Sequence, residues 1–169
     1  GMSNSNSSPT LINCTFTGNL VDSGSGGGML NDVSSPTLVD CTFTNNTAAY
    51  GGGLYNAFSS PNLTGCTFEG NSAPSGGGMY TNGGNPLLVR CTFTGNTGTD
   101  GGGMYNQSSN PSMAECTFTD NAATNGGGMY NGSLVEPDLF ACVFTGNSAT
   151  TGGGLYNAFE ASPRLSGCY

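Results

Sequence analysis

Seven cysteines carry the most versatile chemistry in this sequence, because thiols can form disulfides, bind metals or act as nucleophiles. They recur at intervals of 27, 25, 25, 25, 26 and 26 residues, at Cys14, Cys41, Cys66, Cys91, Cys116, Cys142 and Cys168. No Cys-x-x-Cys pair occurs and the chain has no histidine, so a zinc ligand set is incomplete. Even spacing of this kind is typical of a tandem repeat. We therefore predict no metal, no cofactor and a structural role for the thiols.

The ten acidic residues are the other candidates for chemistry, as a paired-carboxylate hydrolase site or a calcium site. They are scattered over different positions of the repeat. Asp40 and Glu115 are equivalent but stand three copies apart, which is about 14 Å at the spacing of stacked strands. Histidine, the commonest general base, is absent. We expect this chain not to be an enzyme.

The charge balance limits the partners. The formal net charge is −8, and the only basic side chains are Arg90 and Arg164. A chain this acidic has no basic patch with which to bind nucleic acid or an anionic membrane. No apolar run approaches the ~20 residues of a membrane span. Gly1 and Met2 look like a residue left by tag removal followed by a start codon.

The elements that must position these residues repeat with the cysteines. A proline lies five residues before each cysteine, and a phenylalanine lies two residues after each of the first six. An asparagine and a Gly-Gly-Gly-Met/Leu-Tyr-Asn segment such as residues 51–56 follow. The period-two alternation of Cys-Thr-Phe-Thr indicates strands, and the triple glycine disfavours a helix. A unit of about 25 residues cannot bury its own apolar face, so the copies must stack in register.

We therefore predict an all-β fold, a right-handed parallel β-helix (solenoid) of about six to seven coils of 25 to 27 residues, filling a single domain over residues 1–169. Cysteine and phenylalanine share a parity and should face inward, together with a stripe of Leu54, Met79, Met104, Met129 and Leu155. Asn46, Asn71, Asn96 and Asn121 should form an amide ladder at a strand end. Disulfides between neighbouring coils would be strained, so the thiols should stay free, and Cys168 is the one we expect to be most exposed.

The words Phe-Thr-Gly-Asn, as in residues 93–96, and Gly-Gly-Gly-Met/Leu resemble the polymorphic outer-membrane protein repeat, whose signatures are Phe-x-x-Asn and Gly-Gly-Ala-Ile/Leu/Val. The resemblance covers nearly the whole chain. It implies a pectin-lyase-like parallel β-helix and a bacterial surface or secreted passenger segment, often adhesive, without catalytic residues. The chain departs from the family in having glycine where alanine is usual, at Gly28, Gly53, Gly78, Gly103, Gly128 and Gly154.

The threonines that flank each phenylalanine should point outward on a flat sheet. This candidate binding face consists of Thr15, Thr17, Thr42, Thr44, Thr92, Thr94, Thr117 and Thr119. Its regular Thr-x-Thr array resembles the face of β-solenoid antifreeze proteins, which implies binding to ice. Threonine is also simply a good exposed strand residue. Glu69 and Val143 interrupt the array.

A second outward stripe is aromatic and consists of Tyr55, Tyr80, Tyr105, Tyr130 and Tyr156. Exposed tyrosines can stack on sugar rings or anchor a protein partner. They can equally pack on one another and stabilise their sheet.

Three functional hypotheses follow from these surfaces. The leading one is a non-enzymatic extracellular module, a structural stalk or adhesin-like passenger segment at the bacterial cell surface, cut from a longer repeat protein. Its partner would be a host or environmental glycan or protein, and its coil ends could associate end to end. The second hypothesis is an ice-binding protein. The third is a fragment of a polysaccharide-active β-helix enzyme.

Overall fold

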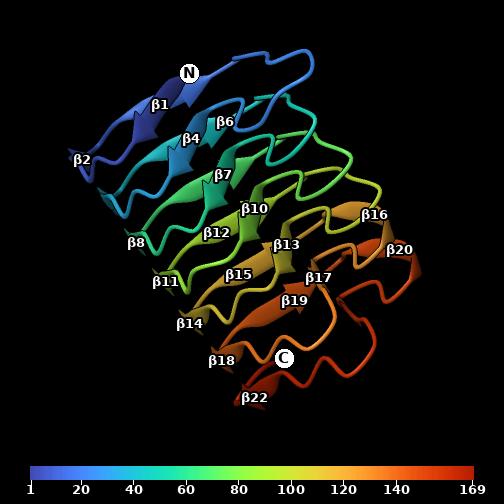
Figure 1. The fold of residues 1–169 in the computed structure, drawn as a ribbon. Coiled ribbons are helices and arrows are strands. Elements are labelled where there is room, and N and C mark those ends of the chain that lie inside the picture. The colour runs from blue at the N-terminus through green and yellow to red at the C-terminus, as the bar shows by residue number, and fades with distance from the viewer.

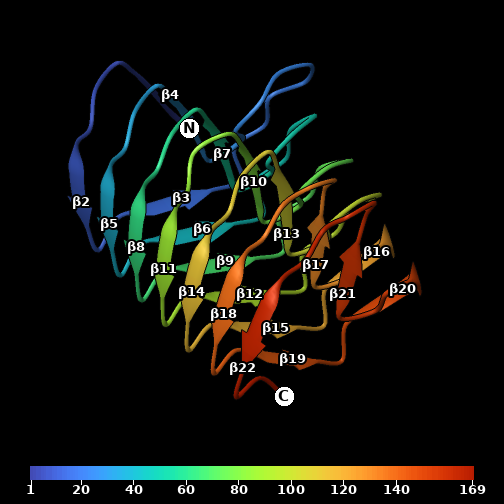
Figure 2. The same ribbon diagram turned by 60° about the horizontal axis from the view of Figure 1, so that its bottom comes forward.

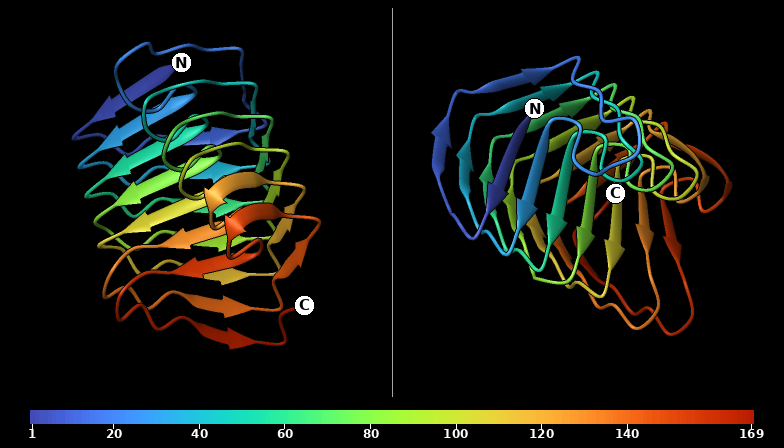
Figure 3. Two further views of the ribbon diagram at one scale, coloured as in Figure 1. Left: turned by 90° about the vertical axis from the view of Figure 1, so that its right-hand side faces the viewer. Right: turned by 45° about the horizontal axis from the view of Figure 1, so that its top comes forward.

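The computed structural model describes residues Gly1–Tyr169 and contains strands but no helix. The chain winds through successive coils of two to four short strands each, and equivalent strands pair in parallel (Figure 1). The two termini lie at opposite ends of the resulting rod (left-hand view of Figure 3). The predicted all-β solenoid of about six to seven coils is confirmed, and the structure has about seven.

Three long sheets form the walls. Sheet A contains β1 (Met2–Ser5), β4 (Met29–Asp32), β7 (Leu54–Ala57), β10 (Met79–Asn82), β13 (Met104–Gln107), β17 (Met129–Asn131) and β21 (Leu155–Asn157). Sheet B contains β2 (Thr10–Ile12), β5 (Thr37–Val39), β8 (Asn62–Thr64), β11 (Leu87–Val89), β14 (Ser112–Ala114), β18 (Asp138–Phe140) and β22 (Arg164–Ser166), seen side by side in Figure 2.

Sheet C contains β3 (Thr15–Thr17), β6 (Thr42–Thr44), β9 (Thr67–Glu69), β12 (Thr92–Thr94), β15 (Thr117–Thr119) and β19 (Val143–Thr145). A two-stranded fourth sheet pairs β16 (Ala122–Asn125) with β20 (Ser148–Thr151). The right-hand view of Figure 3 shows the strands of successive coils lying in rows. Every wall of the rod is therefore built from the same part of each coil.

In-register pairing turns each repeated residue into a column along the rod. Phe93 pairs with Phe68 on one side and Phe118 on the other, and all three side chains are fully buried. Their rings stack face to face with centroids 4.7 Å apart. Cysteine, leucine and methionine columns complete a core cluster of 19 buried residues. The predicted inward parity of cysteine, phenylalanine and the Leu/Met stripe is confirmed.

The predicted asparagine ladder lies inside the corner that follows sheet C. Asn46, Asn71, Asn96 and Asn121 are fully buried. Each side-chain Nδ2 donates to the Oδ1 of the asparagine one coil further on, at 2.8 to 3.0 Å. It also donates to a phenylalanine carbonyl one coil back, as Asn96 Nδ2 does to Phe68 O at 2.9 Å. A buried amide is stable when its donors and acceptors are paired in this way.

A second asparagine ladder, which was not predicted from the sequence, runs along the inner face of sheet A. Its rungs are Asn4, Asn31, Asn56, Asn106, Asn131 and Asn157, bonded at 2.8 to 2.9 Å where two asparagines are adjacent. Thr81 takes the fourth rung, between Asn56 and Asn106. Its shorter side chain breaks the column, and Asn56 Nδ2, Thr81 Oγ1 and Asn106 Oδ1 are buried without partners.

The third glycine of each triplet is needed because the coils approach closely there. A Cβ atom added to Gly53 would lie 2.5 Å from the carbonyl oxygen of Gly78 and 3.1 Å from Cδ1 of Phe68. The same two contacts recur at Gly78 and Gly103. Alanine, which the outer-membrane repeat usually has here, would therefore clash with the carbonyl oxygen of the next coil and crowd the edge of the phenylalanine ring. The departure from that pattern has a steric reason.

The corners between sheets hold several non-glycine residues in the left-handed region. At the corner between sheets A and B, Val33 has a φ of 48° and Phe58 a φ of 46°. At the corner between sheets B and C, Arg90 and Glu115 have φ of 52° and 55°. This conformation costs an L-residue roughly 1–2 kcal/mol, so stacking with the neighbouring coils must impose it.

Candidate binding faces

Threonines line the outer face of sheet C. In β6, β12 and β15 the central phenylalanine is buried while both flanking threonines remain partly exposed. Parallel pairing sets Thr92 beside Thr117 and Thr94 beside Thr119. All eight predicted face residues therefore share one surface: Thr15, Thr17, Thr42, Thr44, Thr92, Thr94, Thr117 and Thr119. Glu69 replaces a threonine between Thr44 and Thr94.

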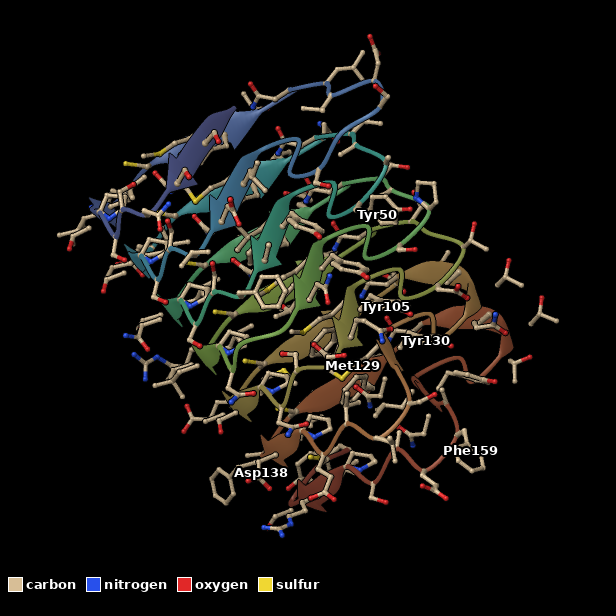
Figure 4. All side chains as sticks on the ribbon, viewed as in Figure 1. Tyr50, Tyr105, Met129, Tyr130, Asp138 and Phe159 are labelled. Atoms are coloured by element: carbon tan, nitrogen blue, oxygen red, sulfur yellow. The ribbon has the colours of Figure 1, made fainter.

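The tyrosine stripe lies on the outer face of sheet A, where Figure 4 labels Tyr105 and Tyr130. Its members, Tyr55, Tyr80, Tyr105, Tyr130 and Tyr156, pair in register. Neighbouring rings stack with centroids 4.6 to 5.2 Å apart. Stacking covers both faces of the three central rings, and Tyr80 is only 9% exposed. The stripe therefore offers ring edges and hydroxyl groups to a partner, while a sugar would need a free ring face.

The surroundings of the three central tyrosines, Tyr80, Tyr105 and Tyr130, favour the neutral hydroxyl. Burial, with the neighbouring tyrosine and Asp100 as further causes, raises the pKa of Tyr105 to about 12. The same causes raise the pKa of Tyr130, and burial with three neighbouring tyrosines raises that of Tyr80 further still. The Tyr105 hydroxyl donates to Gln107 Oε1 at 3.0 Å. At neutral pH the hydroxyls of these three residues are therefore uncharged hydrogen-bonding groups.

The cysteines form a column inside the rod, and all seven are free thiols. Five are buried, and only Cys14 and Cys168 in the first and last coils are partly exposed. The buried thiols lie close to backbone carbonyls, as Cys66 Sγ does to Leu38 O at 3.6 Å. Burial is the main cause that raises the pKa of Cys41. No group of three or more cysteine or acidic side chains is arranged to hold a metal ion.

A hollow on the outer face of sheet B was not predicted. It has a volume of about 330 Å³ and spans strands β11 to β22. The small side chains of Ser112 and Ala114 on β14 form its floor. Leu87 stands on one side, and Asp138, Phe140 and Arg164 stand on the other. Figure 4 labels Asp138, on β18 near the lower end of the rod.

The sequence contains a signal for this hollow that the repeat pattern obscures. The third residue of each sheet B strand points outward, giving the column Ile12, Val39, Thr64, Val89, Ala114, Phe140 and Ser166. Side-chain size falls at Ala114, rises at Phe140 and falls again at Ser166. The Phe140 ring forms the wall of the hollow, and the small residue Ala114 beside it forms part of the floor. The sequence alone does not show that Ala114, Phe140 and Ser166 are neighbours, because this depends on the register of the strands.

Parallel coils joined by continuous interior columns define a β-solenoid, a class whose outer faces are available for binding. The chain belongs to the right-handed β-helix family, because the family's right-handed β-helix region matches residues 2–168. Comparison with curated proteins and with solved structures gave no match. The structure has no helix that could span a bilayer.

Proposed function

We propose that this chain is a non-enzymatic solenoid module, a structural stalk or adhesin-like passenger segment of a bacterial surface or secreted protein. The two sequence signatures favour repeats of the polymorphic outer-membrane protein type within the β-helix family. In this role the rod holds its outer faces in a fixed arrangement and at a fixed distance from the part of the protein to which it is attached. Its partners would be glycans or proteins of a host or the environment.

The observation that carries the proposal is the continuity of the buried asparagine ladder from Asn19 to Asn147. Each inner Oδ1 accepts two hydrogen bonds from the preceding coil, for example from the backbone N and the Nδ2 of Asn71 to Asn96 Oδ1 at 2.9 and 3.0 Å. Such bonds join the successive coils from Asn19 to Asn147, and between the inner rungs they lie away from water, where a broken pair leaves an unsatisfied amide. A chain fastened in this way is suited to act as a stiff spacer.

The stalk role is tested by stretching single molecules between their two ends. The parent should unfold at higher force than an Asn96→Ala variant, which breaks one rung. Asn62→Ala, on the exposed outer face of sheet B, is the matched control and should unfold like the parent. Equal unfolding forces for all three proteins would contradict the role given to the ladder.

The non-enzymatic part is tested by incubating the protein with polysaccharides and measuring new reducing ends and unsaturated products. We expect none. Product formation by the parent that is lost in a folded carboxylate variant, such as Asp138→Asn, would instead support a fragment of a polysaccharide-active β-helix enzyme. Protease shaving and antibody labelling of intact bacterial cells test the surface location, which an exclusively internal pool would contradict.

Ice binding is the second candidate, and one observation favours it. Thr92, Thr94, Thr117 and Thr119 form a two-by-two array on adjacent strands, at the ~4.8 Å spacing of a parallel sheet. Thermal hysteresis and ice shaping test this function. A folded Thr92→Tyr, Thr94→Tyr double variant should lose activity while Tyr105→Ala keeps it. If the parent has no hysteresis, the threonines are ordinary exposed strand residues.

A further inference from the structure

The hollow on sheet B differs from both predicted faces in offering a free aromatic ring face. Phe140 is 59% exposed, and its register neighbours on either side are Ala114 and Ser166. Neither neighbour has a ring to stack on it, in contrast to the tyrosines of sheet A. An exposed phenylalanine with two small neighbours presents a flat apolar surface that the packing of the sheet does not use.

Polar groups stand beside this ring. Asp138 lies two residues before Phe140 on β18, so both side chains point to the same face of the sheet. Arg164 pairs in register with Asp138 on the next strand. A carboxylate accepts hydrogen bonds, and a guanidinium donates up to five in a fixed plane. The Ser112 hydroxyl on the floor can do either.

These groups define the chemistry of a ligand. It needs a flat apolar face for Phe140, hydroxyl groups that donate to Asp138, and oxygens that accept from Arg164. The volume of about 330 Å³ is at the lower limit for small-molecule sites, which suits one ring. The net charge of −8 and the carboxylate in the hollow disfavour a polyanion. A neutral pyranose has all the required features.

We propose that the hollow lined by Phe140, Asp138 and Arg164 binds one pyranose ring of a neutral polysaccharide. The apolar face of the sugar stacks on Phe140, its hydroxyl groups donate to the Asp138 carboxylate, and its oxygens accept from the Arg164 guanidinium. This site rests on the proposed function as a binding module and gives it a ligand class. It also moves sugar binding from the self-stacked tyrosines to sheet B.

Affinity electrophoresis of the whole chain tests the site, in native gels that contain xyloglucan, galactomannan, mixed-linkage β-glucan or, as an anionic comparison, polygalacturonate. We expect at least one neutral polysaccharide to retard the parent. Phe140→Ala should weaken binding about tenfold or more, because a central aromatic contact is lost. Asp138→Asn and Arg164→Gln should each weaken it by about three- to tenfold.

The matched control is Val89→Ala, which trims the same column of sheet B two strands away from Phe140 and outside the hollow lining. It should bind like the parent, and circular dichroism should show that all variants are folded. Three results would overturn the site: no retardation in any neutral gel, retardation in polygalacturonate alone, or undiminished binding by Phe140→Ala. None of them bears on the stalk role, which the stretching experiment decides separately.

Discussion

Replacing Thr81 by asparagine should stabilise the protein, because it would complete the broken ladder on the inner face of sheet A. Asn56 Nδ2, Thr81 Oγ1 and Asn106 Oδ1 now have no partner in a buried site. An asparagine at position 81 would accept from Asn56 and donate to Asn106. The intact rungs on either side show the geometry, with Asn31 bonded to Asn56 at 2.8 Å and Asn106 to Asn131 at 2.9 Å.

The expected gain follows from two new buried hydrogen bonds. Each contributes about 0.5–1.5 kcal/mol net, and pairing an orphaned buried group is worth about 1–3 kcal/mol. We therefore expect the free energy of unfolding to rise by about 2 kcal/mol. For a chain of this size that corresponds to a rise in Tm of about 4–8 °C.

Thermal and urea unfolding measure the effect, and Thr81→Val is the control. Valine has nearly the shape of threonine and removes the orphaned Thr81 hydroxyl, but it leaves Asn56 and Asn106 unpaired, so its midpoint should rise less than that of Thr81→Asn. The urea m-value should not change, because the surface exposed on unfolding is the same. The reasoning would be wrong if Thr81→Asn unfolded at or below the midpoint of Thr81→Val.

Three further predictions concern packing and ionisation. Gly103→Ala places a Cβ 2.5 Å from the carbonyl oxygen of the next coil, so the free energy of unfolding measured in urea should fall by about 2–3 kcal/mol. In the control Gly154→Ala the nearest contact of the new Cβ is 3.6 Å away, and the free energy of unfolding should hardly change. Phe93→Ala should cost about 3–5 kcal/mol through its cavity, whereas the outward Thr94→Ser should stay within about 0.5 kcal/mol; comparable midpoints would contradict the inward and outward assignment. Because the pKa of Tyr105 is raised to about 12, the folded state keeps its proton above pH 10 and should lose stability as pH rises from about 10 to 12. An absorbance titration in which every tyrosine ionises near pH 10 in the folded protein would refute this.

The fold could be predicted because the repeat spacing, the parity of Cys-Thr-Phe-Thr and the need to stack small units all indicate the same solenoid. The asparagine after each tyrosine lies two residues after the inward Leu/Met stripe, so the period-two alternation already indicated that it faces inward. The repeat alone does not show that these side chains bond to one another. The break at Thr81 matters only once Asn56 and Asn106 are known to be its neighbours. The tyrosine stripe was predicted as outward, but the sequence does not show that stacking covers the ring faces.

The asparagine ladders also give the rod a direction. Wherever two asparagines are adjacent, the oxygen of the later one faces the preceding coil and an N–H of the earlier one donates to the following coil. The side-chain dipoles therefore add along the axis, as peptide dipoles do in a helix. The Gly1 ammonium donates to Asn19 Oδ1 at the first coil, where the column offers an acceptor. A further coil or a second copy can continue these columns only head to tail, because two like ends would set oxygen against oxygen or NH2 against NH2.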